Sequence, residues 1–522
     1  MEWSNNRQET IERVVVSAEQ MRQIEGRIFS AGMPVEALME KVAGLLTTRI
    51  VATYSLENFP SVGVLVGPGH NGGDALVIAR ELHLQGYKVS IFCPFSKLKP
   101  LTGNHASYAR SLGIPFYDRA HPLKNAQFLI DGLFGFGLTR ELSGELAAEV
   151  EEINSWSQPI ASIDLPSGIH TDTGAVLGTA VKATQTFCLG LWKRAFFQDA
   201  ALSHCGRATL IDFGIPLADI RAILEPVPTI ERVTNATMRE HLPLPRPPVT
   251  HKYKQGHLLL ICGSRRYCGG AILTGLGARA SGVGMLSIAV PESLKLLLVS
   301  HLPEALIVGC PETKTGAIAE FPDVLDDLEQ FSAIVCGPGL TLDARSRVRE
   351  ILNVNAPLIL DADALNCLAQ WGTTSTLAQR QGETILTPHL GEFKRLFPDF
   401  NYPLQDAIAS AQNAAAQSGA IIVLKGARTA IAHPNGSVKI VPESTPALAR
   451  GGSGDVLAGL IGGLVAQPTT DIAATVATAA AWHARAGLLA AGERTELGVD
   501  AHTLGQFLTP ALAEILANFL QS

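Results

Sequence analysis

The sequence predicts two α/β domains with mostly parallel sheets, and three observations support this fold class. Short runs rich in Val, Ile and Leu alternate with longer segments of helical periodicity in both halves of the chain. Of the 522 residues, 47% are hydrophobic and 17% are charged, so large cores can form. Between Glu225 and Tyr253 the alternation stops and prolines gather, which indicates a joint; they are Pro226, Pro228, Pro243, Pro245, Pro247 and Pro248.

We therefore expect a first domain over residues 1–228, a proline-rich linker over 229–248 and a second domain over 249–522. In the first domain, residues 21–50 have helical periodicity with a break at Gly32-Met33-Pro34. A strand at 61–66 leads through a glycine-rich turn into a helix at 74–84. Further strands are predicted at 87–92, 127–130, 159–163 and 183–189.

The second domain shows the same alternation of strands and helices. Its predicted strands lie at 257–262, 285–290, 333–336, 358–360 and 421–424. Strands that alternate with helices in this way favour a parallel sheet, whose ligands bind outside the carboxyl ends of the strands.

Composition excludes several classes of protein. A formal net charge of -7 disfavours nucleic acid as a partner, and the chain has no run of five like charges to hold a membrane surface. The N-terminal segment Met1–Thr10 is polar, unlike a signal peptide, and the longest apolar stretch, Val456–Ala466, is too short to cross a bilayer. Eight cysteines without a C-x-x-C pair indicate reduced thiols and argue against zinc. A cytoplasmic enzyme is expected.

A glycine-rich segment, Gly67-Pro68-Gly69-His70-Asn71-Gly72-Gly73-Asp74, stands between the strand at 61–66 and the following helix. It formally matches the dinucleotide fingerprint G-x-G-x-x-G. The usual NAD site also needs an acidic residue at the end of the next strand, and Ile91-Phe92-Cys93-Pro94-Phe95 contains none. The segment therefore predicts a phosphate-cradling turn rather than a standard NAD site.

Polar side chains also follow the next strands. Asp131, Asp164 and Ser167 stand where two strands end, and could converge there with Asn71. Oxygen ligands of this kind suit a hard cation. The alternative is that Asp131 and Asp164 are ordinary turn or cap residues.

Together these segments resemble the epimerase domain of NAD(P)H-hydrate repair proteins over about residues 16–216. The resemblance implies a Rossmann-like three-layer α/β/α fold, a potassium ion and an acid/base residue, Asp164. It implies K⁺ ligands at Asn71, Asp131 and Ser167, and substrate contacts from His70, Asn71, Gly72, Gly73, Asp74, Gly135, Phe136, Gly137, Leu138, Thr139, Arg140, Glu141 and Asp164. The chain departs from the family pattern at His70, at Lys41 (both usually Asn) and near Thr184 (often an acid).

The most informative residue of the second half is Asp455, in Gly451-Gly452-Ser453-Gly454-Asp455 before an apolar helix. A glycine-rich turn into a helix N-terminus presents bare N–H groups to an anion, and a carboxylate there can take a proton from a hydroxyl that is being phosphorylated. The chain has no G-x-x-x-x-G-K-[ST], so it is no P-loop NTPase. The alternative is a glycine-rich turn whose aspartate caps the helix.

Several further segments accompany Asp455: His251–Gly256, Gly263–Ala271, Cys336–Leu340, Leu360–Asn366, Thr387–Phe393 and Leu424–Thr429. An isolated His389 is more often a cap or core residue than a ligand contact. Together the segments resemble the ribokinase-like dehydratase domain of the same family, from about 250 to 519, with Arg450-Gly451-Gly452 in place of the usual Thr-x-Gly. The resemblance implies substrate contacts from Ala271, Gly339, His389 and Asp455, and nucleotide contacts from Lys425, Gly426, Ala427, Arg428, Thr429 and Gly454.

The resemblance implies one bifunctional enzyme that repairs the hydrated cofactors NADHX and NADPHX. The first domain would interconvert the R and S hydrates. The second would phosphorylate the S hydrate with ADP or ATP, with Mg²⁺, and eliminate phosphate to restore the cofactor; fused proteins of this kind favour ADP. A homo-oligomer is expected. The alternatives are a vitamin-precursor kinase fused to a non-catalytic NAD(P)-binding domain, and a first half that only senses NAD(P)(H) or contacts other proteins.

Overall fold

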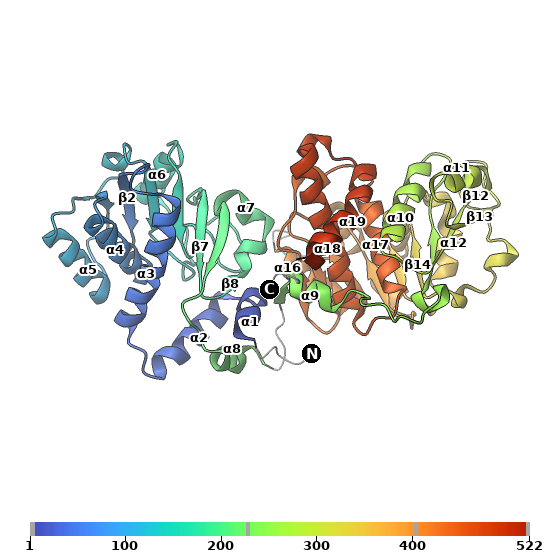
Figure 1. Ribbon diagram of the computed structural model, residues 1–522, viewed down its shortest axis with the longest axis horizontal. Coiled ribbons are helices and arrows are strands. Elements are labelled where there is room, and N and C mark those ends of the chain that lie inside the picture. Colours follow the sequence, from blue (N-terminus) through green and yellow to red (C-terminus); the bar gives the residue numbers. More distant parts are fainter. Residues whose placement is uncertain (1–5, 226–229, 401–405, 518–522) are drawn as a thin grey trace. The chain divides into compact units, whose positions relative to one another are not determined.

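The computed structural model describes residues 6–225, 230–400 and 406–517, and its chain divides into two compact units, Met1–Pro228 and Thr229–Ser522 (Figure 1). Pro226 and Pro228 of the predicted joint lie outside the described residues. Within the described ranges, no helix is both long and apolar enough to cross a membrane.

The first unit contains a seven-stranded parallel sheet of order β4-β3-β2-β5-β6-β7-β9. Its strands are β2 (Ser61–Val66), β3 (Lys88–Phe92), β4 (Phe116–Tyr117), β5 (Phe128–Gly132), β6 (Ile160–Ile163), β7 (Gln185–Leu189) and β9 (Arg207–Ile211), and a separate pair joins β1 (Val15–Val16) to β8 (Trp192–Lys193). Its helices are α1 (Arg7–Arg13), α2 (Ala18–Ser30), α3 (Val35–Thr53), α4 (His70–Leu84), α5 (Pro100–Ser111), α6 (Gly144–Asn154), α7 (Asp199–Cys205) and α8 (Leu217–Leu224).

Helices cover both faces of this sheet. Val64 of β2 belongs to a core cluster that includes residues of α3 and α4, whereas its neighbour Leu65 belongs to a second cluster with Val150 of α6. Successive strand residues point to opposite faces, so the two clusters lie on the two sides of the sheet. The three-layer α/β/α arrangement expected for this unit is therefore present (Figure 1).

The second unit contains a ten-stranded sheet of order β10-β19-β18-β17-β16-β15-β14-β11-β12-β13, parallel except where β18 pairs with β17 and β19. Its strands are β10 (Ile230–Arg232), β11 (His257–Ile261), β12 (Met285–Pro291), β13 (Leu306–Cys310), β14 (Ala333–Cys336), β15 (Leu358–Leu360), β16 (Thr384–Leu386), β17 (Ile421–Leu424), β18 (Ala430–Ala432) and β19 (Val438–Ile440). Its helices are α9 (Asn235–Glu240), α10 (Cys268–Ala280), α11 (Lys295–His301), α12 (Arg345–Ile351), α13 (Asp363–Trp371), α14 (Thr373–Leu377), α15 (Leu390–Leu396), α16 (Ala407–Ser418), α17 (Ser453–Val465), α18 (Ile472–Arg494) and α19 (Ala501–Ala517).

The structure differs from the sequence-based expectation in the linker and at the start of one helix, and it contains strands that the sequence did not indicate: β1, β4, β8, β9, β13, β16, β18 and β19. The segment 229–248, predicted as an extended linker, includes β10 and α9, and β10 pairs with β19 of the second sheet. Proline density predicted extended chain, but the prolines at 243–248 come after these two elements. The helix predicted at 74–84 begins at His70, so residues 70–73 form its first turn instead of a loop.

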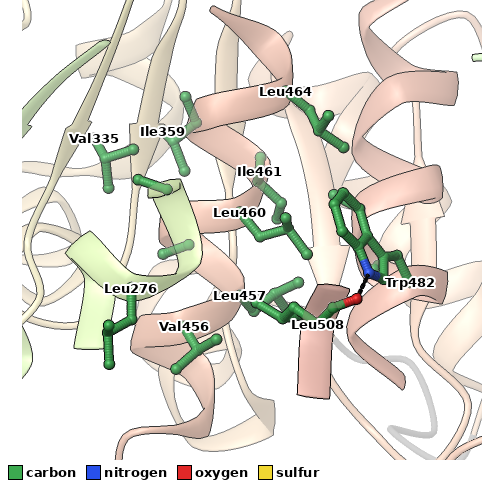
Figure 2. Close-up of a cluster of buried hydrophobic side chains, with 14 of the residues drawn as sticks. Leu276, Val335, Ile359, Val456, Leu457, Leu460, Ile461, Leu464, Trp482 and Leu508 are labelled. Atoms are coloured by element: carbon green, nitrogen blue, oxygen red, sulfur yellow. Dashed lines mark hydrogen bonds between the residues drawn. The ribbon is translucent and has the colours of Figure 1, made fainter. Parts of the chain in front are cut away.

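Helix α17 lies at the centre of the second unit's core. Figure 2 shows its apolar side chains between Val335 and Ile359 of the sheet on one side and Trp482 of α18 on the other. The Trp482 indole Nε1–H donates to the main-chain oxygen of Leu508 at 2.6 Å, which satisfies the one polar atom of that side chain (Figure 2).

Helices α10 and α17 approach one another backbone to backbone. A Cβ on Gly459 would lie 1.9 Å from the Thr274 oxygen, and one on Gly277 would lie 2.0 Å from the Val456 oxygen. Only glycine fits at both positions, because no neighbouring side chain is there to move aside. This contact fixes the position of α17, and with it Asp455 in the first turn.

We predict that Gly459→Ala destabilises the second unit by about 1–3 kcal/mol or more, because the added methyl overpacks a helix–helix contact. Hydrogen exchange of α10 and α17 amides over a urea series would measure the effect. The matched control is Gly492→Ala in α18, where a Cβ meets nothing within 4 Å; this change should be neutral or stabilise by up to about 1 kcal/mol. If the protection of these amides were lost at the same urea concentration in the two variants, the prediction would be contradicted.

Candidate active sites

A cavity of about 650 Å³ opens in the first unit at the carboxyl ends of its strands. Its lining includes these residues singled out from the sequence: His70, Asn71, Asp74, Gly135, Phe136, Gly137, Leu138, Thr139, Arg140 and Asp164. Gly72, Gly73 and Glu141 do not line it. Gly72 instead allows close packing, since a Cβ there would lie 1.9 Å from the Gly67 oxygen.

Asp164 follows β6 directly and is held in an unusual conformation. Its φ of 67° is one that a non-glycine residue adopts only at a cost of about 1–3 kcal/mol, which the surroundings must offset. Its Oδ2 accepts from the Phe136 N–H at 2.8 Å, and its Oδ1 accepts from Lys193 Nζ at 2.6 Å. The side chain is buried yet lines the cavity. A simple turn residue would not need a buried cation beside it.

Lys193 of β8 is a functional candidate that sequence reasoning missed. Its side chain is fully buried and also donates to the main-chain oxygen of Leu189. Burial is the largest single influence and lowers the pKa of Lys193, but the charge and hydrogen bond of Asp164, with the charges of Cys188 and Glu25, together outweigh it, so the net shift is upward. The available signal was a lysine in the apolar stretch Phe187–Phe197.

Two further carboxyl groups share the cavity with Asp164. Burial raises the pKa of Glu25, on α2, to about 7; Lys193 opposes this shift and the charge of Asp164 adds to it. Burial, with the charges of Asp164 and Glu25, raises the pKa of Asp74 well above its usual range. Glu25 was not singled out from the sequence. Asp164 and Glu25 thus both interact with the Lys193 ammonium group, and Asp74 interacts with these two carboxyls.

Asp131 lies within β5 and does not line the cavity, and the register of the sheet sets it opposite Ser162. Its Oδ1 accepts from Ser167 Oγ at 2.6 Å, and its Oδ2 accepts from Ser162 Oγ and from the Ser167 N–H, each at 2.8 Å. Burial raises the pKa of this carboxyl, and these hydrogen bonds oppose the shift.

Asn71, in the first turn of α4, completes the candidate cation ligands. Its main-chain oxygen faces Gly132, next to Asp131, and its buried Nδ2 has no hydrogen-bond partner among the described residues. The donor set is oxygen-rich and contains one carboxylate. Across the described ranges, no group of three or more His, Cys, Asp or Glu side chains could hold a metal. The residues present fit a monovalent ion better than a transition metal.

In the second unit, Asp455 lies in the first turn of α17, after Gly452 in the left-handed conformation (φ 88°). Burial, and next the charge of Asp361, raise the pKa of Asp455 to about 7, while Lys425 opposes the shift. A carboxyl group with this pKa is suited to accept a proton at neutral pH. The helix cap proposed as the alternative is not formed, since α17 has no side-chain cap.

Lys425 follows β17 and begins the turn Lys425–Thr429 that leads to β18. Its Nζ donates to Asp361 Oδ1 at 2.9 Å, and Thr387 Oγ1 donates to the same oxygen at 2.8 Å. A Cβ on Gly454 would lie 3.2 Å from Lys425 Nζ. Lys425, Gly454 and Asp455 are therefore brought together, with Asp361, whose role the sequence left unassigned, beside them.

Three further predicted residues of this unit, His389, Gly339 and Ala271, lie at turns and helix starts. His389 caps α15: its Nδ1 accepts from the Gly391 N–H at 2.9 Å, and its own N–H donates to Glu392. His389 is therefore a helix cap, which was the alternative to a ligand contact. Its main chain also forms an isolated parallel β-bridge with Lys425. Gly339 has a φ of 68° and lies beside the first turn of α10, where Ala271 is fully buried.

Comparisons with known proteins cover almost the whole chain. Residues 258–510 match a family described as NAD(P)H-hydrate dehydratase, and residues 35–195 match one described as YjeF-related protein N-terminus. The chain is 54% identical to a bifunctional NAD(P)H-hydrate repair enzyme Nnr of Synechocystis sp. over 97% of this chain and 96% of that one. It is 34% identical to another, of Thermofilum pendens, over 94% of each chain.

Among solved structures, an ADP/ATP-dependent NAD(P)H-hydrate dehydratase from Bacillus subtilis, co-crystallized with ATP/Mg²⁺, is 34% identical. The match covers 54% of this chain and 97% of that one, with a TM-score of 0.47.

We predict that Lys193→Met destabilises the first unit by about 3–5 kcal/mol, because it leaves the Asp164 carboxylate buried without its cation. Adding Asp164→Asn should recover part of the loss. Hydrogen exchange of first-unit amides over a urea series measures both. The control is Glu145→Gln, which removes an exposed pair with Arg119 at 3.4 Å and should cost no more than about 1 kcal/mol. A Lys193→Met protein as stable as this control would contradict the prediction.

Proposed function

The chain belongs to the family of bifunctional NAD(P)H-hydrate repair enzymes, and from that premise we propose which residues carry its two reactions. It is an NAD(P)H-hydrate epimerase in its first unit and a nucleotide-dependent NAD(P)H-hydrate dehydratase in its second. Similarity along nearly the full chain carries this conclusion. It disfavours a vitamin-precursor kinase with a non-catalytic partner domain, and a first half that only binds NAD(P)(H).

In the dehydratase unit, Asp455 is the general base that takes the proton from the hydroxyl of the S hydrate as phosphate is transferred. Its pKa of about 7 supports this role, since both forms are accessible at neutral pH. The bare N–H groups at Ser453 and Gly454 face the anion, and Lys425 neutralises phosphate charge. ADP or ATP, with Mg²⁺, supplies the phosphoryl group, and the Lys425–Thr429 turn holds the nucleotide. Ala271, Gly339 and His389 flank the hydrate.

In the epimerase unit, Asp164 moves a proton on or off the hydrate, at the C6 substituent or the ring nitrogen. Its burial, its strained backbone and its bond to Lys193 support a position maintained for chemistry. The loop residues 135–140, with His70, Asn71 and Asp74 of α4, line the cavity and bind the substrate. Asn71, Asp131 and Ser167 would hold potassium, whose charge would offset that of the buried Asp131 carboxylate and draw the strand-end loops together.

We also infer a cytoplasmic homo-oligomer. The eight cysteines are free thiols, which suits a reducing compartment. Exposed apolar side chains on α11 and on the adjacent edge strand β13, namely Leu296, Leu297, Val299 and Leu306, favour contact with a second copy.

A pair of substitutions tests the division of labour. Asp455→Asn should lower dehydration of the S hydrate by about 10²–10⁴-fold, as expected for loss of a general base, and leave exchange of R and S intact. Asp164→Asn should lower exchange of R and S by a similar factor and leave dehydration of the S hydrate intact. Chromatography separates the two hydrates, and the absorbance of reduced nicotinamide reports dehydration. A variant that loses both activities, with both units folded, would contradict two independent sites.

The pH dependence gives a separate test of Asp455. Because the base must be deprotonated, kcat/KM for dehydration should fall about tenfold per pH unit below a pKa of about 7. Asp361→Asn should move this limb to lower pH, because the charge of Asp361 raises the pKa of Asp455. A limb that stays in place in Asp455→Asn would assign it to another group.

Removal of potassium tests the cation site. Epimerisation in sodium or tetramethylammonium buffer should be slower than in potassium buffer. Dehydration of the pure S hydrate, which needs no epimerisation, should not change. Asp131→Asn should weaken the apparent potassium affinity by about 10–100-fold or more. Loss of a contact that merely supports a metal ligand already has an effect of this size. An unchanged potassium response in Asp131→Asn, or epimerisation lost to chelator and restored by zinc, would contradict the assignment.

A further inference from the structure

We propose that Glu25 is the second proton-transfer group of the epimerase site and works with Asp164 from a different wall of the cavity. The inference rests on the proposed epimerase function. Both side chains line the same cavity, Glu25 from helix α2 and Asp164 from the loop after β6. No motif pointed to Glu25, because α2 lies far from the strand-end loops in the sequence.

Helix α2 is fixed in place by contacts that lead to the Asp164 site. The strand before it, β1, pairs in parallel with β8, and the register sets Val16 opposite Lys193, the partner of Asp164. The first residue of α2, Ala18, donates its N–H to Asp172 Oδ1 at 2.8 Å, and Asp172 belongs to the chain that follows Asp164. The position of Glu25 is therefore coupled to the two residues with which it would act.

The groups that face Glu25 come from four elements: Lys193 from β8, Asp164 from the loop after β6, Asp74 from α4, and Arg22 one turn earlier on α2. Burial raises the pKa of Glu25 to about 7, so acid and base forms coexist at neutral pH. Burial, with the charges of Asp164 and Glu25, also raises the pKa of Asp74 well above its usual range. Glu25 is thus one of two carboxyls beside Asp164, and Asp74→Asn serves as the comparison in the test.

Epimerisation then needs one water and one proton relay. The Glu25 carboxyl gives its proton to the hydroxyl oxygen on C6, the C6–O bond breaks with its electron pair on the departing water, and the lone pair of the ring nitrogen forms an N1=C6 double bond. A water adds to the opposite face of C6, its proton passes to Asp164, and the double-bond pair returns to nitrogen. One water leaves and one enters, and the proton on Asp164 returns to Glu25 through the solvent before the next turnover in the same direction. The reverse direction exchanges the roles of the two carboxyls.

The test compares Glu25→Gln with Glu36→Gln, an exposed glutamate on the next helix, in the full-length protein. Glu25→Gln should lower R-to-S and S-to-R exchange by about 10²–10⁴-fold and leave dehydration of the S hydrate unchanged. Glu36→Gln should match the wild type. The wild-type exchange rate should fall as the pH rises through about 7, and Glu25→Asp, which keeps a carboxyl, should keep that limb at a reduced rate.

Stability separates this role from a structural one. A carboxyl whose native pKa is raised costs stability progressively as the pH rises from its unfolded value of 4.5 toward 7. Glu25→Gln should therefore melt at the same temperature as the wild type, or higher, at pH 8. The proposal would be overturned if Glu25→Gln exchanged the two hydrates at the wild-type rate. It would also be overturned if the fall in exchange rate above pH 7 were lost in Asp74→Asn and kept in Glu25→Gln. A wild-type protein that exchanges neither hydrate would instead overturn the epimerase function.

Discussion

The two sites depend on the same electrostatic arrangement, an excess of carboxyl groups around one largely buried lysine. Lys193 is bonded to Asp164, and Lys425 is bonded to Asp361. In each site a further carboxyl, Glu25 or Asp455, has a pKa of about 7. Burial is the largest cause of both raised pKa values, a neighbouring carboxylate adds to each shift, and the single ammonium group of each site opposes it only in part. One carboxyl in each site can therefore exchange its proton near neutral pH.

Much of the surrounding structure can be understood as support for these charged groups. The positive φ of Asp164, and that of Ala362 beside Asp361, are strained positions next to the buried ion pairs. The β1–β8 pair connects α2 to Lys193, and the glycine contact of α10 with α17 sets where Asp455 stands. The two strained positions cost local stability and are held by rigid neighbours, as expected when a site is maintained for its chemistry.

The features that could be predicted from the sequence are those defined by residues close together in the chain. The strands β2, β14 and β17 have the predicted bounds because each is a continuous apolar run between turn signals, and Asp455 stood out because its glycines are adjacent to it. The three-residue strands β10 and β16 were missed, since pairing with distant strands defines them. Glu25 and Lys193 were missed for a related reason: their significance comes from contacts between β1, β8 and α2 that no local pattern carries.

Infrared titration of the unliganded protein tests the shared charge arrangement most directly, because it detects protonated carboxyl groups without substrate. The wild type should lose a protonated-carboxyl signal as the pH rises through about 7, and Glu25→Gln and Asp455→Asn should each remove part of that change. A wild-type spectrum with no carboxyl titrating near neutral pH, or a signal that neither substitution alters, would contradict the account.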